Sequence, residues 1–248
     1  MSNGNPFAAR EVTSRRGGPV KAPLSREVIV TMALELLKKQ GIDGLRLRTV
    51  AAALDTGAAS LYAYVDDASA LQALVLDRAL GAVNVRGAKG GWRACVRSLL
   101  GSYVKVLSDT PGLGQLALNT IAVGPNMLRI YESLLRLFQE GDIDRGRAAW
   151  AVDLVLLYCT AIGAEHGNGL NPGDPEGPLV PALRGASEDD FPLIHASCDE
   201  LLAGTGEERV SWCIDVMLNG VLQTARPKPS AHACSLSPRS AKRTKRAR

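Results

Sequence analysis

The sequence lacks the features expected of a secreted, metal-binding or membrane protein. Its five cysteines are odd in number and form no CxxC pair, which argues against both a disulfide framework and a zinc site. The longest nearly uncharged apolar run, Leu154 to Ala164, is too short to span a bilayer, and the polar start contains no signal-peptide core. We therefore expect a cytoplasmic protein without a membrane segment, a metal or a cofactor.

Catalytic motifs are also lacking. The chain contains no HExxH, GxSxG, Walker or Rossmann pattern, and the Gly112-Leu-Gly114 and Gly204-Thr-Gly206 steps have no flanking strand. Glu165 and His166 are neighbours in the sequence, and adjacent residues on a helix do not face the same way. The sequence therefore predicts that the protein is not an enzyme.

No segment shows the alternating pattern of a strand, so we predict an all-α fold. Apolar residues at helical spacing predict a first helix from about 24 to 40 and a connecting helix at 69–86. Six more helices are expected at 92–109, 113–122, 125–139, 144–166, 188–203 and 207–225. The Pro- and Gly-rich stretch from Gly167 to Gly185 predicts a long loop.

Charge is unevenly distributed along the chain. Residues 226–248 contain eight Lys or Arg and no acidic residue, and residues 1–23 contain four basic residues against one Glu. The overall charge of +4 therefore conceals an acidic body of about −7 between two basic ends. Basic ends add salt-sensitive attraction to nucleic acid, although a solvated tail without a partner is an equally good interpretation of residues 226–248.

Residues 44–65 have the pattern of two short helices joined by a tight turn. The first carries apolar residues at helical spacing, namely Leu47, Val50, Ala51 and Leu54. Asp55 and Gly57 then interrupt it, and both residue types tolerate the left-handed backbone of a sharp turn. The second helix begins with small residues that can approach base edges closely. We therefore predict a DNA-reading helix-turn-helix.

Two segments in the C-terminal half of the chain predict that two copies associate. The helices expected at 144–166 and 207–225 are apolar on most sides, and such helices are buried in a core or against another subunit. We expect them to form a four-helix homodimer interface. A monomeric core is the alternative.

Short motifs across residues 24–225 resemble one known family. In the first part they are Leu34-Glu-Leu-Leu, Gly41-Ile-Asp-Gly-Leu45, Val50-Ala-Ala-Ala-Leu54, Gly57, Ser60-Leu-Tyr62, Tyr64-Val65 and Leu71. In the remainder they are Gly91-Trp-Arg, Tyr103, Gly124-Pro-Asn-Met-Leu-Arg129 and Ser187-Glu-Asp-Asp-Phe-Pro192. The chain is similar to the TetR family of transcriptional regulators, in the branch with a tetracycline-repressor-like C-terminal domain.

The chain departs from the family pattern at four places. Arg46 replaces a Thr that caps the second helix in relatives, and Asp55 replaces the usual Gly of the turn. Ala63 stands where a larger and often basic residue is common, and Ala68 replaces a Lys that contacts the DNA backbone in relatives. Residues 24–71 then hold five Lys or Arg against six Asp or Glu, a weak balance for a polyanionic partner.

We expect the basic arm to supply the missing charge, and the second and third helices to supply the remaining DNA contacts. The predicted DNA-binding residues are Arg15, Arg16, Lys21, Arg46, Arg48, Thr49, Ala58, Ala59, Ser60, Tyr62 and Tyr64. Ala59 and Ser60 are the expected base-edge readers. Leu61 and Val65 are expected in the core, and Tyr62 either packs inward or reaches phosphate.

A pocket between helices of the second domain needs few polar groups in an apolar wall. The candidate ligand-binding residues are Gln115, Asn119, Asn126, Glu165, His166 and His195. Each of them is also compatible with a surface or structural role.

The sequence therefore predicts four parts: a disordered basic arm (1–23), a helix-turn-helix domain (24–71), a ligand-binding and dimerisation domain (72–225) and a disordered basic tail (226–248). The resemblance implies a homodimeric transcriptional regulator that binds a double-stranded DNA operator, most simply a repressor released by a small-molecule effector. The alternative is an interaction protein whose degenerate helix-turn-helix does not read DNA specifically.

Overall fold

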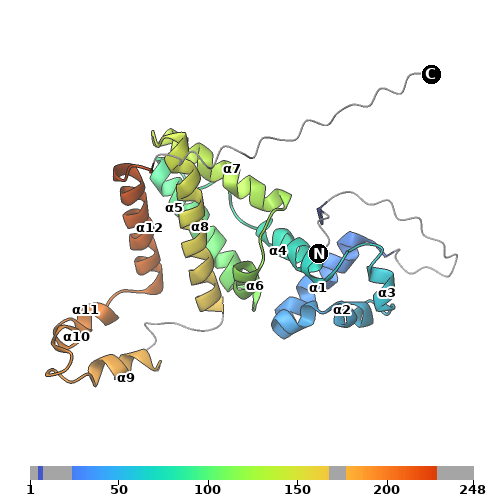
Figure 1. Ribbon diagram of the computed structural model, residues 1–248, viewed down its shortest axis with the longest axis horizontal. Coiled ribbons are helices and arrows are strands. Elements are labelled where there is room, and N and C mark those ends of the chain that lie inside the picture. The colour runs from blue at the N-terminus through green and yellow to red at the C-terminus, as the bar shows by residue number, and fades with distance from the viewer. Residues whose placement is uncertain (1–4, 8–23, 168–176, 228–248) are drawn as a thin grey trace.

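A computed structural model describes residues 5–7, 24–167 and 177–227. Every regular element within those ranges is a helix, which confirms the predicted all-α class. Figure 1 shows a small helical unit at the N-terminal side, a larger helical body, and three short helices that stand away from that body.

The N-terminal unit is built from α1 (Arg26–Gln40), the short 3-10 helix η1 (Gly41–Leu45), α2 (Leu47–Ala53) and α3 (Ala58–Leu61). Ser25 starts α1 as an N-cap, its hydroxyl accepting the Val28 amide at 3.2 Å. At η1 the chain passes so close to α1 that a Cβ on Gly44 would lie 2.6 Å from the Leu36 carbonyl oxygen. Only glycine fits there, which fixes how α2 leaves α1.

The connecting helix α4 (Ala68–Leu80) joins this unit to the body and contacts α1, α6 and α7. The Asp67 side chain caps it by accepting the Ala70 amide at 2.8 Å. The predicted extension to residue 86 is wrong, because the chain leaves the helix at Gly81. The Asn84 amide donates to the Ser102 hydroxyl at 2.9 Å instead of continuing a helical ladder.

The body packs four helices around one core: α5 (Trp92–Ser108), α6 (Leu113–Asn119), α7 (Pro125–Glu140) and α8 (Arg145–Gly167). The central helix is α8, which contacts α5, α6, α7 and the last helix, α12 (Gly206–Gln223). Within the described residues, α8 is the one helix long and apolar enough to cross a membrane, but half of that stretch is buried in the body. Burial among four neighbouring helices is the behaviour of a core helix.

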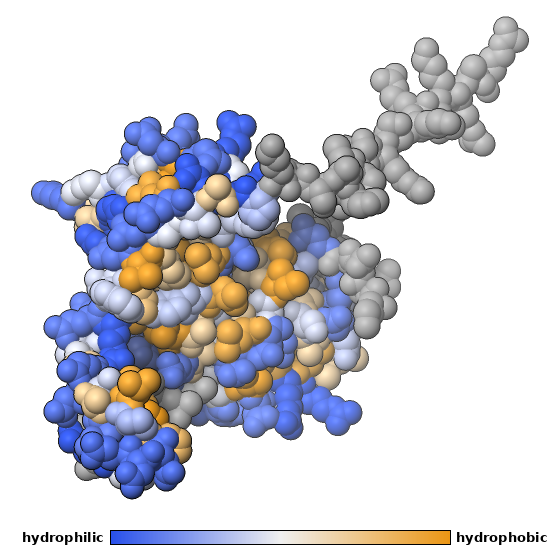
Figure 2. Space-filling view, turned by 60° about the vertical axis from the view of Figure 1, so that its left-hand side comes forward, coloured by the Kyte–Doolittle hydropathy of each residue, from blue (hydrophilic) through white to orange (hydrophobic). Residues whose placement is uncertain are grey.

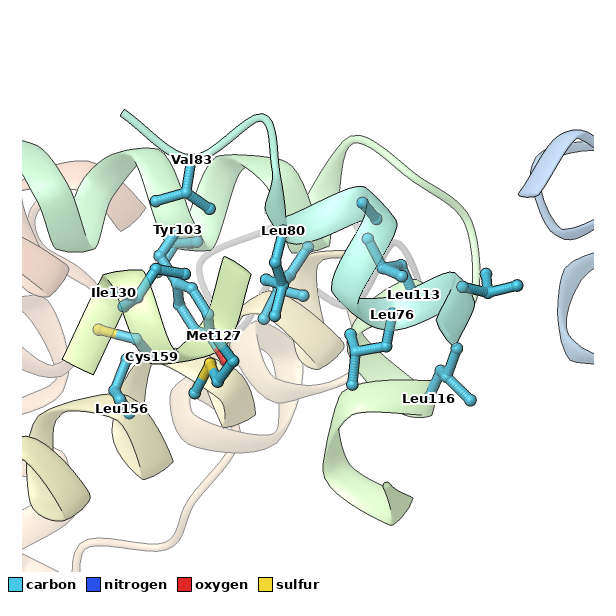
Figure 3. Packing of buried hydrophobic residues seen from close by; sticks show 14 of the residues in the cluster. Leu76, Leu80, Val83, Tyr103, Leu113, Leu116, Met127, Ile130, Leu156 and Cys159 are labelled. Atoms are coloured by element: carbon cyan, nitrogen blue, oxygen red, sulfur yellow. The ribbon is translucent and has the colours of Figure 1, made fainter. Parts of the chain in front are cut away.

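The core is densely packed where α5, α7 and α8 meet (Figure 3). Tyr103 of α5 lies among Met127, Ile130 and Cys159, and only 3 % of it is exposed. Its hydroxyl shares a 2.8 Å hydrogen bond with the Thr160 hydroxyl. Burial raises the pKa of Tyr103 to about 12, because the core disfavours a phenolate.

Replacing Tyr103 by Phe should destabilise the fold by about 1 kcal/mol, since the Thr160 hydroxyl then loses its partner in the core. The double variant Tyr103→Phe/Thr160→Val removes both partners and should recover part of that loss. The raised pKa adds a pH signature. Wild type should lose stability as the pH rises from 10 towards 12, where the unfolded chain releases the proton and the folded chain retains it. Urea denaturation between pH 8 and 11 checks both points, and an equal pH slope in the Phe variant would contradict the second.

The stretch after α8 differs from the prediction. The expected loop contains a helix, α9 (Leu179–Arg184), and the expected helix at 188–203 is instead two short ones, α10 (Pro192–Ala196) and α11 (Cys198–Leu202). Pro192 explains why the helix begins at residue 192 and not at 188, because a residue before proline avoids helical backbone and Phe191 has φ −132° and ψ 57°. The break between the two helices lies at Ser197, whose φ −109° and ψ 14° depart from helical values. None of the three short helices buries a residue.

Candidate DNA-binding and effector sites

The helix-turn-helix has the apolar frame that its sequence predicts. Leu47, Val50 and Ala51 of α2 are buried, and so are Leu61 and Val65 at the end of the unit. Asp55 forms the turn with φ 49°, the left-handed backbone usually supplied there by glycine. The turn closes through the Thr56 amide, which donates to the Ala51 carbonyl at 3.0 Å.

The third helix is shorter than predicted. Its α-helical part covers Ala58–Leu61 alone, and residues 62–64 continue as a turn. Hydrogen bonds from the Tyr64 and Val65 backbone amides to the Leu61 carbonyl hold this turn. Tyr62 is 54 % exposed, so its ring points to solvent rather than into the core. The small N-terminal residues Ala59 and Ser60 are exposed beside it.

The remaining predicted DNA contacts lie on the same unit where the structure describes them. Arg46 and Arg48 are exposed, whereas Thr49, Ala58 and Tyr64 are half-buried. Arg46 makes no side-chain cap bond to α2 and pairs instead with Asp43 at 2.6 Å. The predicted arm residues Arg15, Arg16 and Lys21 lie outside the described residues.

Within the predicted arm, the structure describes residues 5–7. Phe7 is half-buried against the body, and a Cβ on Gly124 would come 2.6 Å from its ring. This segment therefore lies at the start of α7.

The predicted effector residues do not gather in one place. Gln115 and Asn119 stand on α6, where the Asn119 amide donates to the Gln115 carbonyl at 2.8 Å. His195 is exposed on α10, with its imidazole 3.9 Å from the Glu188 carboxylate. Glu165 and His166 lie half-buried at the end of α8. The described residues contain no group of three His, Cys, Asp or Glu side chains that is arranged to hold a metal.

Asn126 takes part in a junction that joins α4 to α7. The Asp77 carboxylate, 4 % exposed on α4, accepts the backbone amides of Asn126 and Met127 at 3.0 Å each. The Asn126 side-chain amide donates to the Asp77 carboxylate and to its carbonyl, both at 3.0 Å. A Cβ on Gly124 would lie 2.2 Å from the carboxyl carbon, so the packing is tight. An anion at a helix N-terminus meets unpaired amides and the positive end of the dipole.

Two hollows open on the body. One, of about 700 Å³, lies along α8 and α12 and is mostly apolar, with Trp150, Leu154 and Leu157 on its wall. The other, of about 640 Å³, lies between α5 and α12 and includes His166. The sequence does not predict this second cleft, because nearly 100 residues separate α5 from α12 and their polar residues look like ordinary surface positions.

Comparison with known proteins identifies the family of this chain. The family model described as "Tetracyclin repressor-like, C-terminal domain" matches residues 86–225. The chain belongs to this family. The predicted family, TetR, is therefore confirmed, including its tetracycline-repressor-like branch.

Solved structures of transcription regulators match 82–85 % of this chain. A putative transcription regulator, SCO7704 from a Streptomyces, is 38 % identical, with 85 % of this chain and all of that chain covered and a TM-score of 0.71. The TetR family protein ActR of Streptomyces coelicolor, in complex with actinorhodin, is 27 % identical, with 82 % and 97 % covered and a TM-score of 0.73. ActR has also been solved in complex with (S)-DNPA.

Curated relatives match a shorter stretch. The HTH-type transcriptional repressor DrrR1 of Streptomyces coeruleorubidus is 32 % identical over 124 residues, which is 49 % of this chain and 46 % of that protein. An HTH-type transcriptional regulator of Saccharopolyspora erythraea is 33 % identical over 109 residues, again 46 % of its length. The chain spans about half the length of the curated relatives it matches.

Proposed function

We propose that this TetR-family chain is a cytoplasmic, ligand-responsive DNA-binding transcriptional regulator, and most simply a repressor released from its operator by a small molecule. The observation that carries the proposal is the exposed surface of α2 and α3, held on a buried apolar frame, with small residues at the start of α3. DrrR1 is named a repressor, and ActR binds small molecules in its own structures.

The predicted DNA-binding residues Arg46, Arg48, Thr49, Ala58, Ala59, Ser60, Tyr62 and Tyr64 remain our candidates, with Arg15, Arg16 and Lys21 of the arm. Tyr62 and Arg48 are exposed and suited to phosphate. Ala59 and Ser60 are small enough to let the helix approach base edges.

We also propose a homodimer that places two such units on one operator. Large apolar side chains stay exposed along α8 and α12, among them Trp150 at 57 %, Leu157 at 63 % and Trp212 at 67 %. Figure 2 shows apolar residues gathered across the centre of this side of the molecule. An exposed apolar stripe on two adjacent helices fits a four-helix interface with a second copy.

A degenerate helix-turn-helix remains the second candidate function. The observation in its favour is charge: residues 24–71 carry more acidic than basic side chains, and Arg46 is already paired with Asp43. A protein of that kind would bind DNA only through its basic ends, and that binding would fade steeply with salt.

A binding experiment separates the two candidates. Purified protein is titrated with labelled intergenic DNA from upstream of its own coding region at two salt concentrations, with random duplex as competitor. We expect a preference for the upstream DNA that persists as salt rises. Arg48→Glu should weaken binding more than tenfold, whereas the same charge change at exposed Arg136 on α7 should matter little. Equal competition by random duplex at both salts would favour the second candidate.

A further inference from the structure

The cleft between α5 and α12 is closed at one end by polar contacts between the two helices. Arg97 of α5 pairs with Asp215 of α12 at 2.5 Å, and one turn away Arg93 donates to the Asn219 side chain at 2.9 Å. From there the two antiparallel helices enclose a space of about 640 Å³ that reaches the C-terminal end of α8. That volume lies in the range of small-molecule sites, about 300–1,000 Å³.

The wall of the cleft is rich in hydrogen-bond donors. Four serine hydroxyls line it, from Ser98, Ser102, Ser108 and Ser211, of which the Ser108 hydroxyl already donates to the Val104 carbonyl at 2.9 Å. Lys105 and Arg97 add positive charge, and Arg97 keeps several N–H groups beyond the one that meets Asp215. Glu207 is the one carboxylate on the wall, so positively charged side chains outnumber negatively charged ones there.

Apolar side chains form the rest of the wall. Val104, Val210 and Ile214 are buried or half-buried beside the serines, and Gly101 presents no side chain to the space. A Cβ placed on Gly101 would meet no atom within 4 Å, so the cleft is open at the middle of α5. Backbone without a side chain, between apolar walls, leaves room for a flat ring system.

We propose that this cleft binds the effector, and that the effector is an oxygen-rich aromatic molecule carrying an anionic group. The inference rests on the proposed function as a ligand-responsive regulator. The ring system lies over Gly101 between Val104 and Val210, and its anionic group lies at Lys105. Its carbonyl or hydroxyl oxygens accept from Ser98, Ser102 and Ser211. At present Lys105 pairs with Asp109, with nitrogen and oxygen 2.9 Å apart and both side chains mostly exposed. Such an exposed pair is weak and yields readily to a ligand anion.

The probe for this class is 1-anilinonaphthalene-8-sulfonate, an aromatic sulfonate whose fluorescence rises on binding. Gly101→Phe fills the cleft without a clash at Cβ, and Gly101→Ala is its matched control because it makes the same helix change without filling the space. We expect the Phe variant to bind the probe at least about tenfold more weakly than the Ala variant, since the ring position is taken.

Charge variants test the anion contact separately. Lys105→Met should weaken sulfonate binding several-fold, and Asp109→Asn should strengthen it, because it frees Lys105 from its pair. The uncharged probe N-phenyl-1-naphthylamine should respond to Gly101→Phe but to neither charge variant.

Two outcomes would overturn the inference. Equal probe binding by the Phe and Ala variants places the probe elsewhere, for example on the apolar face of α8 and α12. If neither charge variant changes the affinity for the sulfonate probe, the anion does not lie at Lys105. The same variants are titrated with the upstream DNA, where Gly101→Phe should retain its affinity. If the probe results contradict the inference while wild type still prefers the upstream DNA, only the assignment of the cleft is wrong. If wild type shows no sequence preference, the proposed function itself is wrong.

Discussion

Replacing Leu157 by Glu should convert the proposed dimer into monomers. Leu157 is 63 % exposed on α8, one turn beyond Leu154 and two turns beyond Trp150, so the three share a stripe along the hollow beside α12. In a two-fold interface every substitution occurs twice. Burying one unpaired carboxylate costs about 3 kcal/mol or more, so two of them weaken the dimer by about ten-thousandfold.

Sedimentation at micromolar concentration measures this effect, and circular dichroism at the same concentration establishes whether each chain remains folded. The exposed position of Leu157 in the single chain predicts an intact helical spectrum. The matched control is Leu128→Glu, which makes the same change at a 61 % exposed leucine on α7 and should leave the dimer intact. A Leu157→Glu variant that still sediments as a dimer would place the interface elsewhere.

Operator affinity should fall together with the dimer. Two linked helix-turn-helix units bind two half-sites with an effective concentration that separate monomers lack, so a monomeric variant loses about a hundredfold or more in affinity. The proposed DNA-contacting residues are untouched by the substitution. Its residual binding to a single half-site should therefore equal that of wild type.

The sequence predicted those parts of the structure whose signal is local. The frame of the helix-turn-helix rests on Leu47, Val50 and Leu61, which follow helical spacing within a short segment, and all three are buried. Likewise the residue type at Asp144 predicts an N-cap for α8, and its carboxylate accepts the Gly146 and Arg147 amides at 3.0 and 3.1 Å. Both predictions needed information from only a few neighbouring residues.

Contacts between segments that are distant in the sequence could not be predicted from it. Asp77 lies within an apolar helical pattern, and no local feature points to partners 49 residues later. Asn126 was predicted to bind the effector because it is polar in an apolar domain. Its side chain instead joins α7 to α4, and a role in binding stays a prediction. The bounds of the short helices were also wrong. Pro192 excludes the helical start expected at residue 188, whereas the Pro- and Gly-rich composition before it favours a loop and hides α9.

Replacing Asp77 by Ala should lower the free energy of unfolding by about 2–4 kcal/mol. The carboxylate is 4 % exposed and accepts two backbone amides and one side-chain amide. Its removal leaves the N-terminal amides of α7 buried without an acceptor, and hydrogen bonds to a charged group are worth more than neutral ones. In a chain of this size, each kcal/mol corresponds to about 2–4 °C in melting temperature, so thermal scans should show a fall of about 5–15 °C.

Two further variants separate the junction from general damage. Asp109→Ala removes an exposed carboxylate from a surface pair and should change stability by less than about 0.5 kcal/mol. Asn126→Ala removes one donor, and in a double-mutant cycle with Asp77→Ala the two losses should fall short of additivity, because both remove the same bond. Fully additive losses would show that Asp77 and Asn126 act independently.

The junction also decides how firmly α4 is held. The next residue, Arg78, reaches Glu27 of α1 at 3.5 Å, so the same end of α4 contacts both α7 and the N-terminal unit. Loosening Asp77 should therefore weaken operator binding even where the protein stays folded, because α4 then holds the N-terminal unit less firmly against the body of the proposed dimer. Titration of Asp77→Ala with the upstream DNA, well below its melting temperature, measures this. Wild-type operator affinity in that destabilised variant would limit the junction to a role in stability.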